Sequence, residues 1–422
     1  MFGYTISIFY HILENFSIDY VKFSSLKIYF HQILTFFLYQ NIIEKGANEK
    51  KLSPLREEIR MSKNDLALLI LDNCKEFGEK VEQNLLQIRN EYKKKYIVNL
   101  DASRFSNGEG KVVIKDSVRD KEIYIFCDIG NYGVTYKCHG KDHEMMPDEH
   151  FQDIKRVISA TCGHSTKVTV VMPLLYQARQ HRRKGRESLD CAIALQELER
   201  LGVKSIITFD AHDPNVINAT PNLSFDNFYP SSTIIEQMAS NDPTIFENSI
   251  VISPDFGAME RARYYAEIIG SDVGVFYKRR DLSKLINGKN PVVAHTYMGS
   301  DVKGKNVVIV DDMIASGGSV IEVSEKLREM GANKICITCT FALFTEGFDK
   351  FLEAHDKGLF DSLYTTNLSY IPTEFSKNDW FHCVDMSYFV AQVIDSMDKK
   401  EPLTQYFNRT NETFKTVQKS KQ

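Results

Sequence analysis

The chain has 422 residues, of which 43% are hydrophobic and 26% charged, and its formal net charge is −4. This composition excludes a wholly disordered or fibrous chain, and the length allows two or three domains with a sizeable core. The charge balance excludes a global positive field, so no nucleic acid is expected as the main partner. The eight cysteines are scattered through the chain, which favours reduced thiols and a cytoplasmic protein.

Residues 1–60 form a hydrophobic N-terminal extension rich in Phe, Tyr, Ile and Leu. Its most apolar stretch, residues 33–39, is shorter than the roughly 20 residues that span a bilayer, and it does not fit a signal peptide. An interfacial membrane helix, a docking helix and an extension ahead of the true start all stay open. Because the composition changes at Met61, we expect residues 1–60 to be dispensable for chemistry, and we expect no firm membrane partner.

Hydrophobic periodicity predicts a helix within residues 63–96, with an apolar stripe that begins at Leu66, Leu69 and Ile70. Beyond it, short apolar runs alternate with amphipathic segments. The predicted strands are Ile123–Phe126, Lys167–Met172, Ser205–Phe209, Ser249–Ile252, Gly274–Tyr277, Asn306–Val310 and Lys334–Phe341. The predicted helices are Ser188–Leu201, Thr233–Met238, Met259–Ile269 and Ser319–Met330.

This alternation predicts an α/β fold in which mainly parallel sheets are covered by helices on both faces. A break near residues 240–244 separates two such runs, so we expect two tandem domains. Their predicted limits are 61–245 and 246–381, and residues 382–422 are expected to add a C-terminal strand, a helix and a polar tail. Cys336 and Cys339 form a C-x-x-C on a predicted strand, where positions three apart face opposite sides, so no redox pair is expected.

The sharpest motif lies at residues 306–319, where an apolar strand ends in Asp311 and Asp312 and a small-residue loop leads into an amphipathic helix. Ligands of open α/β sheets bind at the carboxyl ends of strands. Two glycines allow backbone N–H groups to converge on a phosphate at the positive end of a helix. The two acids suit ribose hydroxyls, directly or through a metal. A merely capped strand–helix turn would explain neither the paired acids nor the double glycine. The loop consists of Ala315, Ser316, Gly317, Gly318 and Ser319.

This segment resembles the phosphoribosyl-diphosphate loop of the type I phosphoribosyltransferase fold. With further motifs in matching order, the chain from about Leu66 to Phe407 resembles the ribose-phosphate pyrophosphokinase family. The resemblance implies two phosphoribosyltransferase-like domains, an ATP side and a ribose 5-phosphate side. It also implies Mg²⁺ as cofactor, transfer of the pyrophosphoryl group of ATP, and a homo-oligomer built from dimers, often a hexamer. A phosphoribosyltransferase and a non-catalytic regulatory relative stay open as alternatives.

Two segments of the first domain match the family's nucleotide site. In residues 103–109, Phe105 can stack on a base and Glu109 can accept from an exocyclic amine, and Asn107 lies between them. The family uses this loop at the nucleotide site of a neighbouring subunit. Residues 176–186 are strongly basic, as a polyphosphate site requires, and the resemblance implies that Arg179 and Gln180 contact ATP. The family commonly has Asp where this chain has His181, so no nucleotide contact is expected there.

Three acid or imidazole side chains are candidate magnesium ligands. Asp210 and His212 follow a predicted strand, and the resemblance places the histidine at the magnesium–ATP phosphates. The resemblance also places Asp255, in the turn at 252–258, opposite the transferred pyrophosphate. A helix N-cap is the alternative role of Asp255.

The predicted catalytic cations are Lys278 and Arg280, which we expect a strand to release into a polar segment. The family's catalytic flexible loop begins with this pattern, and pyrophosphoryl transfer needs cations on the reacting oxygens. The chain departs from the family in two places. Ala315 stands where many members have Asp, and residues 131–151 are longer and carry Cys138, His139, His143 and His150. A solvated insertion is favoured there over a zinc site.

Overall fold

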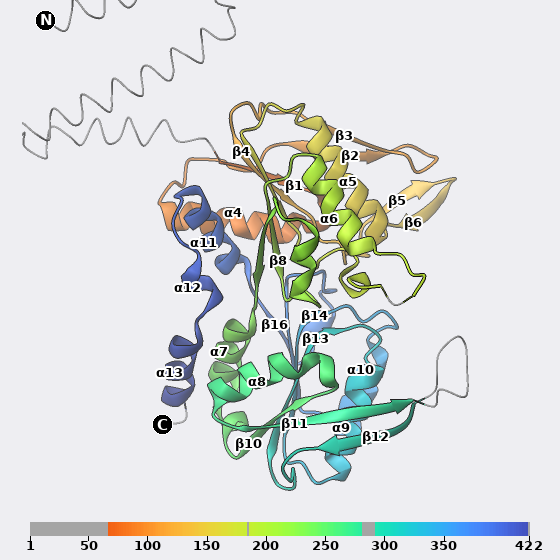
Figure 1. The fold of residues 1–422 in the computed structure, drawn as a ribbon, viewed down its shortest axis with the longest axis vertical. Coiled ribbons are helices and arrows are strands. Elements are labelled where there is room, and N and C mark those ends of the chain that lie inside the picture. Colours follow the sequence, from red (N-terminus) through yellow and green to blue (C-terminus); the bar gives the residue numbers. More distant parts are fainter. Residues whose placement is uncertain (1–65, 184, 281–291, 421–422) are drawn as a thin grey trace, which may run out of the picture. The chain divides into compact units, whose positions relative to one another are not determined.

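The computed structural model describes residues 66–183, 185–280 and 292–420, with the backbone alone at 278–280 and 292–295. The hydrophobic extension at 1–60 and the polar segment at 281–291 therefore lie outside the described residues. Two sheets dominate the described chain (Figure 1). None of the described helices is long and apolar enough to cross a membrane.

The first sheet has five parallel strands in the order β1-β4-β7-β8-β9. These strands are β1 (Leu66–Ile70), β4 (Glu122–Phe126), β7 (Lys167–Val171), β8 (Ser205–Phe209) and β9 (Ser224–Phe228). Its helices are α4 (Lys75–Arg89), α5 (Pro147–Ala160) and α6 (Asp190–Arg200).

The second sheet has seven strands in the order β12-β11-β10-β13-β14-β15-β16, and among them only β12 runs antiparallel to its neighbour. The strands are β10 (Ser249–Ser253), β11 (Asp272–Arg280), β12 (Val292–Met298), β13 (Asn306–Ile314), β14 (Ile335–Ala342), β15 (Ser362–Thr366) and β16 (Phe381–Val384). The helices after β9 are α7 (Ser231–Asn241), α8 (Met259–Ile269), α9 (Gly318–Glu329), α10 (Asp349–Asp356), α11 (Ser387–Asp398), α12 (Thr404–Phe407) and α13 (Thr410–Ser420). The predicted α/β class with two mainly parallel sheets is confirmed.

The two sheets share one apolar core. Leu68 and Ile207 of the first sheet belong to the same buried cluster as Val308 of the second. Two further clusters cover the opposite faces of the first and second sheets. The C-terminal helix α11 returns to the first domain, where Arg89 of α4 binds Asp395 and Asp398 at 2.7 and 2.8 Å. The relative position of the two sheets is therefore fixed by shared burial as well as by ion pairs.

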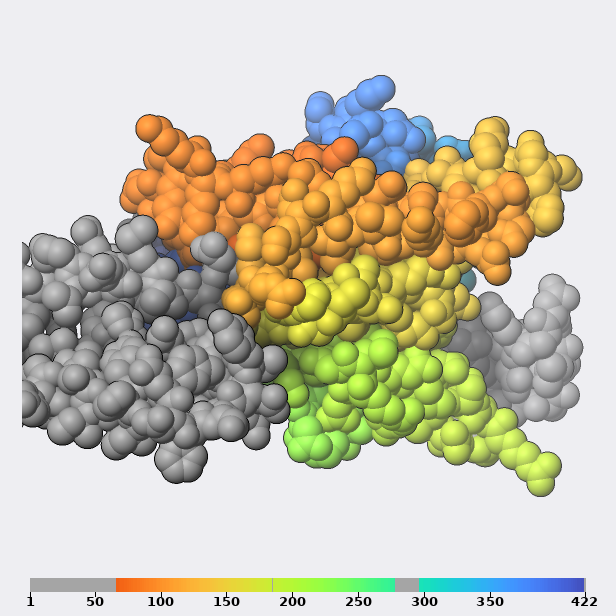
Figure 2. All heavy atoms as spheres, turned by 90° about the horizontal axis from the view of Figure 1, so that it is seen from above, coloured from red at the N-terminus to blue at the C-terminus, as the bar shows by residue number. Residues whose placement is uncertain are grey.

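Two antiparallel hairpins extend from the first domain beside each other. One pairs β2 (Leu100–Arg104) with β3 (Gly110–Ile114), and the other pairs β5 (Thr135–Cys138) with β6 (Lys141–Glu144). Figure 2 shows them from above, orange and gold, in contact with each other. The second hairpin accounts for the unusual segment at 131–151.

The structure corrects three expectations about secondary structure. Leu66–Ile70 is a strand, not the start of a helix. In a short apolar run that is buried on both faces, hydrophobic periodicity cannot distinguish a strand from a helix. Strand β13 continues to Ile314, so Asp311 and Asp312 lie within it. Strand β11 continues to Arg280, because β12 pairs with it through that residue. Lys278 and Arg280 are thus strand residues by backbone.

Most other predicted elements are confirmed within one to three residues at each end. The opposite orientation of Cys336 and Cys339 is also confirmed, since one belongs to the shared core and the other to the cluster on the far face. Besides β1, the sheet strands β9, β12 and β15 were not predicted, whereas β16 (Phe381–Val384) is the expected C-terminal strand. Strand β16 lies in the second sheet, and the domain limits at 245 and 381 stay predictions.

Candidate active site

The loop after β8 carries the first two predicted site residues. Asp210 is 3% exposed, and its backbone has φ +41°, in the left-handed region that Asp tolerates better than most residues. Its carboxylate accepts hydrogen bonds from Arg261 Nε at 2.5 Å and from Thr340 Oγ1 at 2.6 Å. Burial raises the pKa of Asp210, while the Arg261 charge opposes that shift. Both oxygens are occupied by protein donors, which does not favour the predicted role of Asp210 as a magnesium ligand.

The second residue of this loop, His212, joins the two sheets. Its Nδ1 lies 2.6 Å from Asp312 Oδ2. This contact connects the loop after β8, in the first sheet, to β13, in the second sheet. This hydrogen bond raises the pKa of His212. Burial alone would raise the pKa of Asp312, but the bond from His212 and the charge of Arg261 outweigh it and hold that pKa below its usual range. The pair therefore favours an imidazolium beside a carboxylate.

Arg261 of α8 completes this cluster. Its guanidinium bonds Asp210 and lies 3.8 Å, measured from Nη2, from Asp312 Oδ2. The Arg261 side chain is 12% exposed, and the two carboxylates are 3% and 5% exposed. We call Asp210, His212, Arg261 and Asp312 the inter-sheet cluster. It holds two buried acids and the cation that compensates them, with contributions from both domains.

The two adjacent acids of β13 differ in their surroundings. Asp312 is 4% exposed and its Oδ1 accepts from the backbone N of Met313 at 2.8 Å. Asp311 faces the other side of the strand and is partly exposed. Burial, the charge of Asp312 and the charge of Asp255 raise the pKa of Asp311. Asp311 Oδ1 accepts from the backbone N of Asp312 at 2.9 Å, and Asp255 is exposed.

Asp255 itself caps the short 3₁₀ helix Phe256–Ala258, with Oδ1 accepting from Gly257 N at 2.7 Å. Asp255 therefore acts as a helix cap, which was its alternative role, and its second carboxylate oxygen is left for another partner. Within the described residues, no group of three His, Cys, Asp or Glu side chains is arranged to hold a metal ion. A magnesium ion here would need oxygens from a bound substrate, which is how Mg²⁺ is usually held.

The small-residue loop follows β13 as expected. Gly317 has φ +81°, and a Cβ there would lie 2.4 Å from the Phe351 ring, so only glycine fits. Helix α9 begins at Gly318, which places its positive N-terminal end at this loop. Ala315 accepts a backbone bond from Thr345 at 2.9 Å. Ser316 and Ser319 lie on either side of the two glycines, so the expected strand–loop–helix turn is present, and its phosphate-binding role stays a prediction.

The basic segment after β7 lies near His212. Arg179 and Gln180 form the end of a 3₁₀ turn, Ala178–Gln180, and the Arg179 charge lowers the pKa of His212, against the stronger effect of Asp312. The His181 ring centroid is 5.5 Å from that of His212, and its Nε2 is 3.2 Å from Asp213. His181 thus contacts protein groups beside the cluster. Gln180 donates to the Ser188 carbonyl at 2.8 Å.

The predicted adenine loop lies apart from this cluster. Phe105, Asn107 and Glu109 sit in the turn between β2 and β3, and Phe105 is 54% exposed. In the part of the chain that the structure describes, no hydrogen bond, ion pair or ring contact joins them to Arg179, Gln180 or His212. Asn107 Nδ2 instead donates to Glu109 Oε2 at 2.9 Å. The predicted ATP residues therefore fall into two separate groups within one chain.

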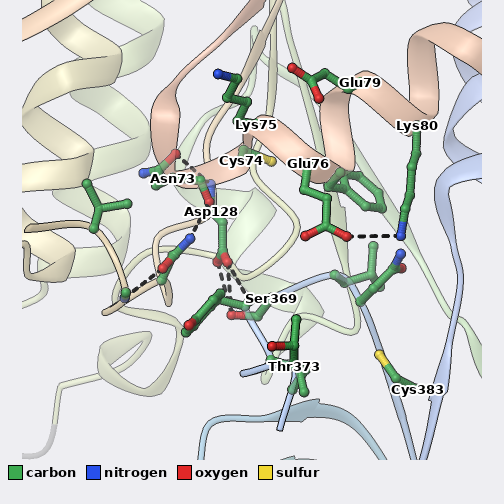
Figure 3. A pocket seen from close by; sticks show the side chains of 18 of the residues that line it. Asn73, Cys74, Lys75, Glu76, Glu79, Lys80, Asp128, Ser369, Thr373 and Cys383 are labelled. Atoms are coloured by element: carbon green, nitrogen blue, oxygen red, sulfur yellow. Dashed lines mark hydrogen bonds and ion pairs between the residues drawn. The ribbon is translucent and has the colours of Figure 1, made fainter. Parts of the chain in front are cut away.

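A pocket of about 630 Å³ lies elsewhere, between the start of α4 and the loop after β15 (Figure 3). At its floor, buried Asp128 accepts from Tyr370 N at 2.7 Å and from Ser369 Oγ at 3.0 Å. Burial raises the pKa of Asp128 to about 7, against these hydrogen bonds. None of the predicted site residues lines this pocket.

Arg261 and Thr340 are the site residues that the sequence did not single out. A signal was present for Arg261, which falls between buried Ala258 and buried Tyr265 at helical spacing. A charge inside such an apolar stripe indicates a buried partner. Thr340 lies on a wholly buried strand and carried no comparable signal.

Family models built from known proteins match segments in both halves of the chain. A family model described as the N-terminal domain of ribose phosphate pyrophosphokinase matches residues 66–202, and a phosphoribosyl transferase domain model matches residues 231–367. Together these models cover well over half of the chain. The phosphoribosyl transferase match includes Arg261, Asp311 and Asp312, and the N-terminal match includes the adenine loop.

Whole relatives agree with the two models. The chain is 27% identical to a ribose-phosphate pyrophosphokinase of Vibrio parahaemolyticus over 309 residues, covering 72% of this chain and 90% of the relative. It is 29% identical to one of Mycoplasmopsis pulmonis over 301 residues, covering 70% and 85%. A phosphoribosylpyrophosphate synthetase structure from Mycobacterium smegmatis has the same fold, with a TM-score of 0.66, 20% identity, and coverage of 80% of this chain and all of that one. With both domain models matched in order along one chain, the protein belongs to the ribose-phosphate pyrophosphokinase family of enzymes.

Proposed function

We propose that this enzyme transfers the pyrophosphoryl group of ATP to the anomeric hydroxyl of ribose 5-phosphate. The hydroxyl oxygen attacks the β-phosphorus, the bond between that phosphorus and the oxygen bridging to the α-phosphorus breaks, and AMP leaves with the bridging oxygen. The hydroxyl proton is released, and 5-phosphoribosyl 1-pyrophosphate is the second product. Names of relatives with 27–29% identity support this reaction class.

The observation that carries the proposal is the hydrogen bond between His212 and Asp312 at 2.6 Å. It joins the segment proposed for the ATP phosphates to the segment proposed for the ribose. A transfer between two bound substrates requires their sites to meet, since most of the catalytic gain comes from positioning and charge stabilisation. The inter-sheet cluster supplies that meeting point.

The ribose 5-phosphate side rests on the second sheet. We assign the 5-phosphate to the turn of Ser316, Gly317, Gly318 and Ser319, with Ala315 at its entrance. The positive φ of Gly317 and the N-terminal end of α9 favour anion binding at this turn. Of the two acids, Asp311 is the better acceptor for ribose hydroxyls, because Asp312 already accepts from His212 and Met313.

The ATP side rests on the first domain. Arg179, Gln180 and His212 are proposed to hold the phosphates, and Phe105, Asn107 and Glu109 to hold adenine. The exposed position of Phe105, away from His212, supports the idea that its loop serves a neighbouring copy of the chain. The active enzyme is then a homo-oligomer in which each site draws on two subunits.

The residues at the cluster fit a magnesium ion that is shared with the substrate. Asp255 and Asp311 are the proposed carboxylate ligands, and His212 Nε2 is proposed to join them by giving up its proton when the ion binds, whereas Asp210 is left to its bonds with Arg261 and Thr340. When bound, Mg²⁺ would offset phosphate charge and orient the oxygens of the transferred group. Lys278 and Arg280 are the proposed cations for the charge that develops during transfer.

The decisive experiment is incubation of the full chain with ATP, Mg²⁺ and ribose 5-phosphate, with nucleotide products separated by chromatography. We expect AMP and phosphoribosyl pyrophosphate in equal amounts. Formation of ADP would indicate an ordinary kinase. In a parallel incubation with phosphoribosyl pyrophosphate and a nucleobase but no ATP, release of pyrophosphate would indicate a phosphoribosyltransferase. Either result, or no turnover, would contradict the proposal.

A further inference from the structure

The hairpin β5–β6 lies directly behind the loop that carries Phe105. The backbone N of His139, at the hairpin's tip, donates to the Ser106 carbonyl at 2.9 Å. Gly108 has φ +92°, and a Cβ placed on it would lie 3.3 Å from Tyr136 Oη and 3.6 Å from Cys138 Sγ. The tip and the first strand of the hairpin therefore support the loop from one side.

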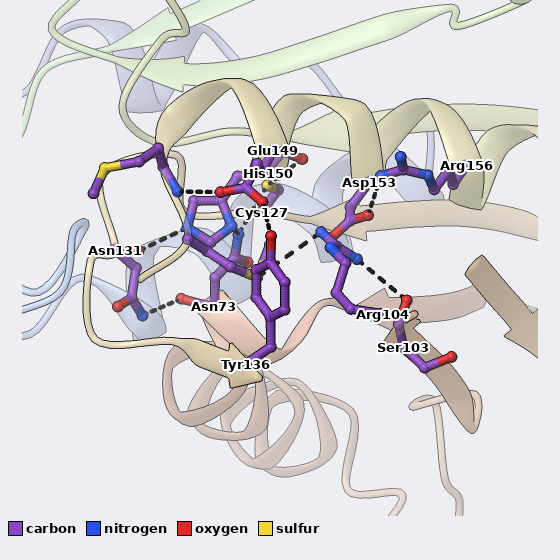
Figure 4. Close-up of polar contacts among 12 residues, drawn as sticks. Asn73, Ser103, Arg104, Cys127, Asn131, Tyr136, Glu149, His150, Asp153 and Arg156 are labelled. Carbon is purple, nitrogen blue, oxygen red and sulfur yellow. Dashed lines mark hydrogen bonds and ion pairs between the residues drawn. The ribbon is translucent and has the colours of Figure 1, made fainter. Parts of the chain in front are cut away.

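A single carboxylate, Glu149 of helix α5, contacts both hairpin strands, and Figure 4 shows its bond to Tyr136. Glu149 accepts from Tyr136 Oη of β5 at 2.7 Å through Oε1. Its Oε2 lies 3.1 Å from His143 Nε2 of β6 and accepts from Met146 N at 3.0 Å. The bond to Glu149 raises the pKa of Tyr136 to about 12, so the phenol stays a donor at neutral pH.

The same helix fixes the base of the Phe105 loop. Arg104, the last residue of β2, donates to Asp153 at 2.6 Å, and both side chains are about nine-tenths buried or more. The Arg104 guanidinium also lies 5.6 Å from the Tyr136 ring centroid, within cation–π range. The opposite end of the loop, Gly110, packs against the Arg156 guanidinium, which a Cβ at this position would displace. Both ends of the loop and its back therefore depend on α5 and the hairpin.

We infer that the β5–β6 hairpin is a positioning element for nucleotide recognition, which acts through Tyr136 to hold the Phe105 loop in the geometry that selects adenine over guanine nucleotides. This inference rests on the proposed function, because it takes Phe105 and Glu109 as the adenine contacts. It assigns a role to the long segment at 131–151, which would otherwise be a solvated insertion. A loop held on three sides loses less conformational entropy on binding, so the support improves affinity.

The test is Tyr136→Phe in the full chain, assayed for AMP formation with ATP and with GTP. Loss of a bond to a charged acceptor should raise KM for ATP about three- to tenfold, with kcat and KM for ribose 5-phosphate unchanged. The preference for ATP over GTP should fall, because base contacts distinguish the two. A matched control on the same hairpin is Lys137→Ala, which removes an exposed ion pair with Asp142 and should leave both KM values at the wild-type level.

A double variant decides whether Tyr136 acts through the loop. In a Phe105→Ala background, Tyr136→Phe should raise KM for ATP no further, since two changes in one unit are not additive. Full additivity, or an unchanged nucleotide preference with a lower melting temperature, would overturn the inference and leave the hairpin a stabilising element only. The assay of the wild-type enzyme distinguishes a failure of the proposed function from a failure of this inference. An inactive wild type overturns the proposed function and this inference with it, whereas an active wild type with unaffected variants overturns this inference alone.

Discussion

The inter-sheet cluster and the Phe105 loop are both proposed to hold substrate, yet they are built in opposite ways. In the cluster, Asp210 and Asp312 are 3% and 5% exposed and share the compensating charge of Arg261. In the loop, Phe105 is 54% exposed and is held mainly by backbone and by the hairpin behind it. One site is embedded between two sheets, and the other extends from one domain.

This difference separates two tasks. A buried, fully compensated charge cluster keeps its geometry without ligand, as electrostatic catalysis requires. An exposed loop is completed only when a nucleotide or a neighbouring subunit covers it. Changes in the cluster should therefore affect rate and stability, whereas changes around the loop should affect nucleotide affinity.

The largest effect should come from Arg261→Gln, which removes the cation shared by the two buried acids. Breaking a buried ion pair from one side typically costs about 3–5 kcal/mol of unfolding free energy. We expect a marked fall in the thermal unfolding midpoint, together with a loss of AMP formation. Arg261→Lys should recover part of the stability and little of the activity, because lysine cannot donate from two nitrogens of a planar group.

The matched control is Arg263→Gln on the same helix. Arg263 is 69% exposed and pairs with Glu267 at 3.5 Å, an arrangement worth little in water. Its variant should be indistinguishable from wild type. If Arg261→Gln were as stable and active as that control, the cluster would not be the centre of the site.

The next effect in size should be a fall in kcat in Lys278→Ala. Removing one electrostatic contact to the transition state typically costs on the order of 10²–10³ in rate. ATP affinity should change much less, because a contact made only in the transition state does not contribute to ground-state binding. Arg280→Ala should behave alike. A dissociation constant for ATP that rises in proportion to the rate loss would make Lys278 a ground-state phosphate anchor instead.

A smaller and more selective effect is expected at the two acids of β13. Asp311→Asn should raise KM for ribose 5-phosphate about tenfold, because it removes a charged acceptor, and should leave the ATP dissociation constant unchanged. Asp312→Asn should disturb both substrates, because it also breaks the bond to His212. Identical kinetics for the two variants would contradict the division of roles between them.

Most residues of the proposed site could be predicted from the sequence, because they follow the ends of strands. The carboxyl ends of β8, β10 and β13 each carry a predicted group: Asp210 and His212, Asp255, and the acid pair with its glycines. Parallel strands bring such ends together at one sheet edge, so local patterns were enough. The meeting of His212 with Asp312 depends on the packing of two separate sheets, and no local pattern reports that.

The misses also have physical causes. Leu66–Ile70 is apolar at every position, so periodicity could not separate a fully buried strand from a helix. Strand β12 pairs antiparallel with β11 at the sheet edge. The prediction assumed parallel strands that alternate with helices, so it did not include this strand. The support given by Tyr136 and Glu149 joins residues 13 apart across a turn and a helix start, so only the folded chain reveals it.

The smallest effect should be a change in the pH dependence of stability around His150, beneath the hairpin. His150 is 1% exposed, with Nδ1 2.7 Å from Asn73 Nδ2 and Nε2 2.7 Å from the Asn131 carbonyl. The amide nitrogen donates and the carbonyl accepts, so these partners fit a neutral ring that is protonated on Nε2. Burial lowers the pKa of His150, against the bond to Asn131.

This lowered pKa fixes the sign of the effect. As pH falls from about 6.5, the ordinary histidine value, toward the folded pKa, the unfolded chain takes up a proton that the folded chain refuses. Stability should therefore fall with pH in this window, by at most about 1.4 kcal/mol per pH unit from this group. His150→Gln removes the group, so the unfolding midpoint of the variant should decline less between pH 7 and pH 5 than that of wild type. His139→Gln, which removes an exposed imidazole at the hairpin tip, should keep the wild-type dependence. An equal decline in wild type and His150→Gln would show that His150 does not impose this pH dependence, and KM for ATP measured on the same samples would reveal whether the hairpin's support depends on it.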